Sequence, residues 1–191
     1  MPYITDRVVH DADSHTMELP DWFTEFGTDK VKKAFSARFA GSIDLQGLPT
    51  LHKSTEYRSR NEAEIMSRKN YQALGTFIGD DRSEAVDHIG VATQLVFPTS
   101  PNVWLEQLEH ADDIELLYQV ADATNRAQAA FCANDPRLFS VGYVPLADLE
   151  RTARATESAL SLGANALLIP WACPKNHATS HIALDALWSR A

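Results

Sequence analysis

The chain has 191 residues, of which 45% are hydrophobic and 23% charged, a composition typical of a globular protein with a sizeable core. Its 26 acidic and 17 basic residues give a net charge of −9, which argues against nucleic acid as a partner because phosphate binding calls for a basic face. No apolar run approaches the ~20 residues that cross a bilayer. The first residues lack the apolar core of a signal peptide, so we expect a cytoplasmic protein that acts on a small molecule, not at a membrane.

The first predicted element is a short strand over residues 8–15 that ends in a group of potential metal ligands. Alternation along a strand places Asp11, Asp13 and His15 on one face. A carboxylate and an imidazole two residues apart can bind one divalent ion. The same spacing also fits a polar strand end without metal, in which His15 is satisfied by backbone groups. Asp11 either orients His15 or caps the strand, and Glu18 either reaches the metal or caps the next turn.

Residues 16–78 show no regular apolar pattern, and we expect a long insertion or cover loop after the first strand. Within it, residues 36–57 are rich in Gly, Ser and Thr, whereas the spacing over 61–74 favours a charged surface helix. Arg58 and Arg60 lie in this loop, where a guanidinium fork is suited to bind a substrate carboxylate. The alternative for both arginines is simple solvation.

From residue 80 onward, strands and helices alternate. The expected elements are a helix over 82–89, a strand over 94–97, a helix capped by Asp112 or Asp113, a strand over 139–145, a helix between Asp148 and Gly163, a strand over 166–169 and a helix over 182–191. Nearly continuous apolar strands are typical of an α/β fold with a parallel sheet covered on both faces. Ligands of such folds bind at the C-terminal ends of the strands. Trp171 and His177 follow the last strand on that side, as candidate substrate-binding residues or as packing over the mouth.

Several segments, taken in order, resemble the amidohydrolase-related family, in the branch that includes aminocarboxymuconate-semialdehyde decarboxylase. The matching segments are Asp11-Ala12-Asp13-Ser14-His15 with Glu18-Leu19-Pro20, residues 90–98, Asn125-Arg126, Pro136-Arg137-Leu138-Phe139, Val144-Pro145-Leu146 and Leu162-Gly163-Ala164. The resemblance covers nearly the whole chain and is weakest over residues 16–78.

This resemblance implies a (β/α)8 TIM barrel of the metal-dependent hydrolases, with divalent Zn2+ or Mn2+ at the C-terminal ends of the strands. Asp13 and His15 are then the metal ligands. The implied reaction is hydrolysis or non-oxidative decarboxylation of a small carboxylic acid, amide or lactone. Asp13 stands where the family commonly has a histidine, and an added carboxylate shifts the preference toward harder ions.

A full barrel needs ~250 residues, so we expect residues 1–191 to form one domain that is the N-terminal part of a barrel, about four β/α units. The resemblance places the remaining ligands and the catalytic histidine beyond residue 191, and we expect little turnover from this chain alone. One alternative is a non-catalytic half-barrel that binds a partner or self-associates through its open sheet edges. Another is a ligand-binding domain without metal. We also expect a homo-oligomer.

Overall fold

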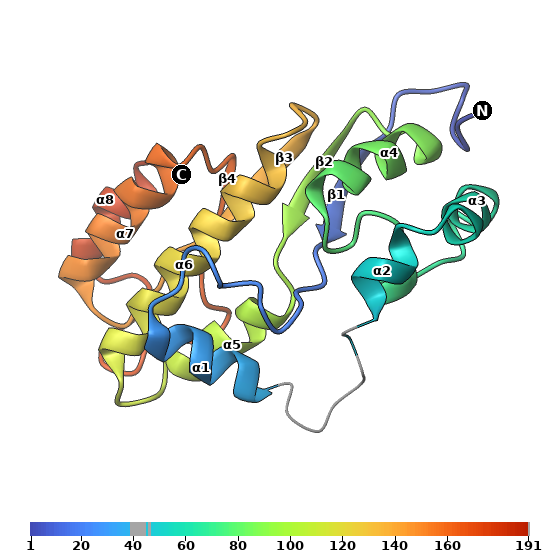
Figure 1. The fold of residues 1–191 in the computed structure, drawn as a ribbon. Helices are drawn as coiled ribbons and strands as arrows, with labels where there is room; N and C mark the ends of the chain where they lie inside the picture. The colour runs from blue at the N-terminus through green and yellow to red at the C-terminus, as the bar shows by residue number, and fades with distance from the viewer. Residues whose placement is uncertain (39–44, 46, 191) are drawn as a thin grey trace.

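The computed structural model describes residues 1–38, 45 and 47–190, which form an α/β fold around a four-stranded parallel sheet (Figure 1). The strands pair in chain order and are β1 (His10–His15), β2 (Thr93–Phe97), β3 (Leu138–Tyr143) and β4 (Ala166–Leu168). Because the strands are parallel, their C-terminal ends lie at one edge of the sheet. The four strands expected from the sequence are therefore confirmed.

Three of the expected helices also form where their end signals predicted them. They are α4 (Gly79–Ile89), α6 (Ile114–Cys132) and α7 (Leu149–Ser161). The side chain of Asp113 caps α6 by accepting a hydrogen bond from the Leu116 N–H, and Asp148 caps α7 in the same way through the Arg151 N–H. In the described part of the chain, no helix has the length and apolar character of a membrane span.

Around β2, the described helices pack against one face of the sheet and leave the other less covered, whereas the sequence indicated cover on both faces. Val96 of β2 is fully buried against Val86 of α4 and Phe131 of α6. Its neighbours Leu95 and Phe97 point to the opposite face and remain only half-buried among the described residues. A continuous apolar run therefore marks burial, but it does not reveal that the two faces differ in their cover.

The stretch 16–78 is not irregular throughout, since about half of its described residues are helical. It contains α1 (Asp29–Arg38), α2 (Leu48–His52), α3 (Thr55–Ala63) and the 3-10 turn η1 (Asn70–Gln72). The helix expected over 61–74 is wrong, because the Ser54 side chain accepts a hydrogen bond from the Tyr57 N–H and starts the helix earlier. Part of the Gly/Ser/Thr-rich segment over 36–57, including Gly41, lies outside the described residues.

The largest core cluster joins this stretch to a helix that the sequence did not indicate, α5 (Ser100–Leu108). Phe23 and Phe35 are buried and pack with Trp104 of α5. In Figure 1, α1 and α5 lie at the end of the sheet toward which the arrowheads of β1 and β2 point. The chain after β1 thus builds part of the C-terminal end of the sheet.

The last expected helix, over 182–191, is replaced by two short pieces. These are the 3-10 turn η2 (Ile182–Leu184) and α8 (Asp185–Trp188). Leu184 and Leu187 are buried in the cluster that covers α7. The sequence therefore predicted a helical segment here but not the break between the two turns.

Candidate metal and substrate site

β1 is irregular in the middle of its ligand cluster. Asp11 pairs with Gln94 and Ser14 pairs with Val96, so three residue steps on β1 match two steps on β2. The extra residue is a β-bulge, which reverses the alternation of side chains that follow it.

The bulge separates Asp11 from the residues with which it was expected to share a face. The Asp11 carboxylate accepts a hydrogen bond of 3.1 Å from the Gln94 side chain, which lies 3.5 Å from the Arg82 guanidinium of α4. Ser14, beyond the bulge, accepts from the same guanidinium at 2.8 Å. Asp11 is therefore on the helix-covered side and does not orient His15, so the predicted common face of the three ligands is wrong.

Asp13 and His15 do meet at the end of β1. His15 Nε2 lies 3.2 Å from Asp13 Oδ1, and His15 Nδ1 lies 3.1 Å from the hydroxyl of Thr99. The imidazole stacks on Phe97, with 5.6 Å between ring centroids. The side chains of Asp13 and His15 are 89% and 39% exposed, so an ion from solvent can reach both.

The hydrogen bonds around Thr99 assign the tautomer of His15. The Thr99 hydroxyl donates to the Thr16 carbonyl at 2.6 Å, so it can only accept from His15 Nδ1–H. Neutral His15 then carries a lone pair on Nε2, and this lone pair faces the Asp13 carboxylate. Two acceptors 3.2 Å apart require a cation between them, either a proton or a metal ion. The expected backbone partners of His15 are replaced by side chains.

The donor set and its spacing fit a divalent ion. Donors about 2.0–2.1 Å from zinc and about 90–110° apart lie roughly 3 Å from each other. The 3.2 Å between His15 Nε2 and Asp13 Oδ1 agrees with this. Within residues 1–38, 45 and 47–190, however, no group of three His, Cys, Asp or Glu side chains is placed to hold a metal. The described chain therefore offers two candidate ligands for such a centre.

Glu18 holds the loop that carries Thr99. This buried carboxylate accepts hydrogen bonds of 2.8 Å from the backbone N–H groups of both Thr99 and Ser100, and one of 2.7 Å from the Thr16 hydroxyl. Burial raises the pKa of Glu18, and these hydrogen bonds partly oppose that shift. Glu18 thus caps the start of α5, a distant partner, and not the next turn of its own segment.

Arg82 fixes the end of β1 from the helix-covered side. Its guanidinium donates to the His15 carbonyl at 2.5 Å, to Ser14 Oγ at 2.8 Å and to the Gly75 carbonyl at 2.7 Å. Burial lowers the pKa of Arg82 to about 10, so the group stays charged at neutral pH. No carboxylate of the described residues forms an ion pair with it. No local sequence pattern marks Arg82, because its partners lie on other elements.

A cavity of about 830 Å³ runs along β1 and contains both candidate ligands. Segment 65–76 forms its other wall. Its polar lining includes Asp13 and His15, together with Arg68 and Lys69. The four residues that the sequence suggested for substrate binding are not among the described residues that line it.

Arg58 and Arg60, the two arginines that were candidates for substrate binding, do not line the cavity along β1. Arg58 donates to Asp81 at 2.9 Å and forms a second ion pair with Glu84, both on α4. Arg60 is 66% exposed and lies 3.6 Å from Glu64 of its own segment. The carboxylate partners of Arg58 occupy the fork that was expected to bind substrate, so the structure gives that role no support.

Trp171 and His177 follow β4 at the C-terminal end of the sheet, as expected. Trp171 is 75% exposed, and its backbone N–H donates to Glu106 at 3.2 Å. His177 Nε2 lies 2.8 Å from the Leu146 carbonyl, which ties the loop after β4 to the loop after β3. Their substrate-binding role stays a prediction.

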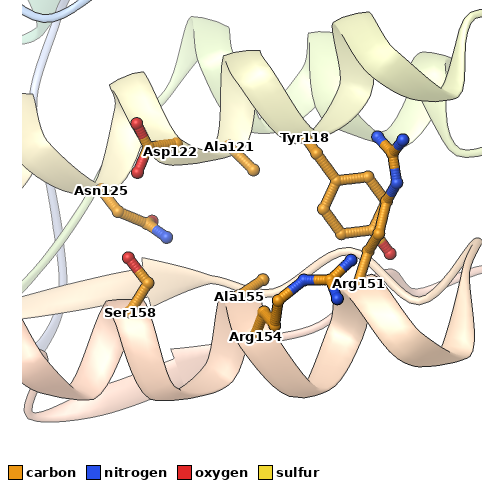
Figure 2. Close-up of a pocket in the computed structure, with 8 residues that line it drawn as sticks. All are labelled: Tyr118, Ala121, Asp122, Asn125, Arg151, Arg154, Ala155 and Ser158. Atoms are coloured by element: carbon orange, nitrogen blue, oxygen red, sulfur yellow. The ribbon is translucent and has the colours of Figure 1, made fainter.

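A smaller pocket of about 300 Å³ lies between α6 and α7 (Figure 2). Several of its polar side chains already have structural partners. The Asn125 side chain bonds both backbone groups of Tyr143, at 2.9 and 2.7 Å, and Arg151 pairs with Glu115 at 2.8 Å. Figure 2 shows Ala121 and Ala155 between these polar ends, as expected where two helices pack closely. We assign this pocket to helix packing.

Comparison with known proteins finds similarity to solved structures. No protein-family model and no curated protein matches the chain. The fold is similar to that of an amidohydrolase from Mycobacterium avium subsp. paratuberculosis K-10, with a TM-score of 0.64 and 20% sequence identity. The match covers 98% of this chain and 56% of the amidohydrolase, so this chain spans little more than half of that protein's length. At this identity, the conclusion is that the chain shares its fold with part of an amidohydrolase structure.

Proposed function

We propose that the chain supplies the first four β/α units of a (β/α)8-barrel enzyme of the amidohydrolase superfamily. The reaction is metal-dependent hydrolysis or decarboxylation of a small carboxylic acid, amide or lactone. The observation that carries this proposal is the pair of acceptors, His15 Nε2 and Asp13 Oδ1, that converge at 3.2 Å at the C-terminal end of β1. The shared fold supports the same assignment.

In this proposal, Asp13 Oδ1 and His15 Nε2 hold a zinc or manganese ion. In such centres a divalent ion activates water and polarises a substrate oxygen. Thr99 keeps the imidazole proton on Nδ1, Glu18 holds Thr99, and Arg82 holds the backbone of His15. Asp13 and His15 therefore act as ligands and carry no proton in the reaction.

Isothermal titration calorimetry of the purified chain with zinc and with manganese tests the proposal, because it measures the affinity and the number of bound ions. We expect one site that His15→Ala and Asp13→Ala each abolish. The matched control is His10→Ala, because His10 lies on the same strand but faces the Thr93 hydroxyl at 2.7 Å and no carboxylate. Absence of binding in the unmodified chain, or equal loss in the control, would overturn the proposal.

A second candidate is a module that self-associates without catalysis. It is favoured by β1, which among the described residues pairs only with β2 and leaves its other edge free. A free edge is a template for pairing with another chain, and the expected homo-oligomer would use it. Light scattering coupled to size exclusion tests this candidate, since a monomer at all concentrations contradicts it.

A further inference from the structure

A third pocket, distinct from the one between α6 and α7, shares Thr99 with the cavity along β1. Its volume is about 440 Å³, and its described lining consists of Arg38, Thr99, Ser100 and Val103. Thr99 is the residue that binds His15 Nδ1, so this pocket begins beside the candidate metal ligands. It belongs to the C-terminal end of the sheet, where ligands of parallel α/β folds bind.

Arg38 is the charged side chain in the described lining of this pocket. Its guanidinium lies 5.5 Å from the ring centroid of Trp104 and donates a hydrogen bond of 3.2 Å to the Gln107 side chain. Among the described residues no carboxylate lies within ion-pair distance of it, whereas Arg58, Arg137 and Arg151 all have such partners. A guanidinium has five N–H donors, and the described residues engage only a minority of those of Arg38.

The remaining lining defines what Arg38 can recognise. The backbone N–H groups of Thr99 and Ser100 are used by Glu18, so Arg38 is the source of charge for a ligand. Val103 is 47% exposed and offers apolar contact. A planar guanidinium held against an aromatic ring favours a planar, two-oxygen anion.

We propose that Arg38 binds the carboxylate of a small organic acid with an apolar or aryl body, seated against Val103 and Thr99. The assignment of Arg38 stands on the pocket itself. Its extension, that the reacting end of the same molecule points past Thr99 toward Asp13 and His15, rests on the proposed function. Arg38 thus takes the specificity role that the sequence suggested for Arg58 and Arg60.

The test is a titration of metal-free protein with benzoate. NMR monitors the chemical shifts of the Val103 and Ser100 amides and of the Trp104 indole N–H during the titration. We expect saturable shifts at these groups and binding of neutral benzamide that is at least about tenfold weaker. Arg38→Gln weakens benzoate binding by a similar factor. Arg60→Gln, which removes another exposed arginine, leaves it unchanged. Equal affinity for benzoate and benzamide, or an unaltered Arg38→Gln variant, overturns the proposal.

A second variant guards against an unfolding artefact. Val103→Asp leaves Arg38 in place and introduces a negative charge into the pocket, so it also weakens benzoate binding by about tenfold. The NMR spectrum of each variant reports directly whether the fold is retained. Unchanged binding by a folded Val103→Asp variant contradicts the pocket.

The same titrations separate this inference from the proposed function. In metal-free protein, His15→Ala leaves benzoate affinity within about twofold, since Arg38 supplies the charge. If zinc does not bind but Arg38-dependent benzoate binding persists, the function fails and the pocket stands. If zinc binds at Asp13 and His15 while Arg38→Gln has no effect on benzoate, the pocket fails and the function stands.

Discussion

Thr99 decides which nitrogen of His15 carries the proton, and therefore whether a lone pair or an N–H group faces Asp13. This role of a single hydroxyl group can be tested. Thr99→Val removes the acceptor for Nδ1–H, so the imidazole proton is free to move to Nε2 and compete with the ion. Loss of such a supporting hydrogen bond typically lowers metal affinity by about 10–100-fold. Zinc calorimetry measures the change.

The control for this variant is Thr93→Val. Thr93 bonds His10 Nδ1 at 2.7 Å across the same pair of strands, so the two substitutions delete the same kind of contact. We expect zinc affinity to stay within about twofold in the control. An equal loss in both variants would attribute the effect to the strands and not to the tautomer of His15.

Glu109 is a second residue with a measurable signature, in the pH dependence of stability. It is buried directly after α5, where one carboxylate oxygen accepts from the Leu146 N–H at 3.0 Å and the other has no hydrogen-bond partner among the described residues. Burial, reinforced by the nearby Glu106, raises the pKa of Glu109 to about 7. The folded state therefore binds this proton more tightly than the unfolded chain does.

It follows that protonated Glu109 stabilises the fold below about pH 4.5 and that this contribution is lost as pH rises to about 7. Urea unfolding at pH 5 and pH 8 measures it. We expect the free energy of unfolding to fall by about 2–3 kcal/mol more in the unmodified protein than in Glu109→Gln. Equal pH dependence in the two proteins would contradict the raised pKa. Glu18 also titrates at a raised pKa, but it is common to both proteins.

At the scale of elements, Arg82 connects α4 to the end of β1. Arg82→Met leaves the carbonyls of His15 and Gly75 without their donor, which costs about 2–4 kcal/mol of unfolding free energy. The end of β1 then loosens, and we expect zinc affinity to fall by at least about tenfold. Urea unfolding and calorimetry at a temperature where the variant is folded measure the two effects.

The matched variant is Arg137→Met. Arg137 pairs with Asp135 and Asp87, both at 2.6 Å, and so also joins separate elements, without touching β1. The Arg137→Met variant should therefore have a lower free energy of unfolding and an unchanged zinc affinity. If both variants lose zinc affinity to the same extent, Arg82 acts on general stability alone.

The helices that the sequence predicted correctly are those whose ends are set by contacts between residues close together in the chain. Asp113, Asp148 and Gly163 mark the ends of helices through contacts within a few residues, so α6 and α7 were placed well. Helix α5 was missed because its signal is tertiary. Phe35 and Trp104 are buried only because distant segments of the chain pack together.

In the candidate site, too, contacts between neighbouring residues could be predicted from the sequence and contacts between distant residues could not. Asp13 and His15 are two residues apart, and their contact could be predicted from the strand alone. Thr99 and Arg82 reach His15 from 84 and 67 residues away, and no pattern near His15 indicates either. The bulge that turns Asp11 away was also invisible, since strict alternation is the simplest expectation for a strand.

At the scale of the whole molecule, we expect the chain alone to have little or no turnover. Two protein ligands hold a catalytic ion weakly, because catalytic zinc sites usually have three. Assay of the zinc-loaded chain on simple lactones, esters and aryl carboxylic acids should give rates equal to those of His15→Ala. A rate clearly above that variant, with no other polypeptide added, would refute this expectation.

The extra residue in β1 also sets the electrostatic character of the candidate ion cradle. With Asp11 held by Gln94 on the far side, the cradle has one carboxylate and one imidazole, a formal charge of −1. Strict alternation would have added a second carboxylate and doubled that charge. The bulge therefore biases the choice of ion toward zinc and away from manganese or magnesium, which prefer oxygen-rich surroundings.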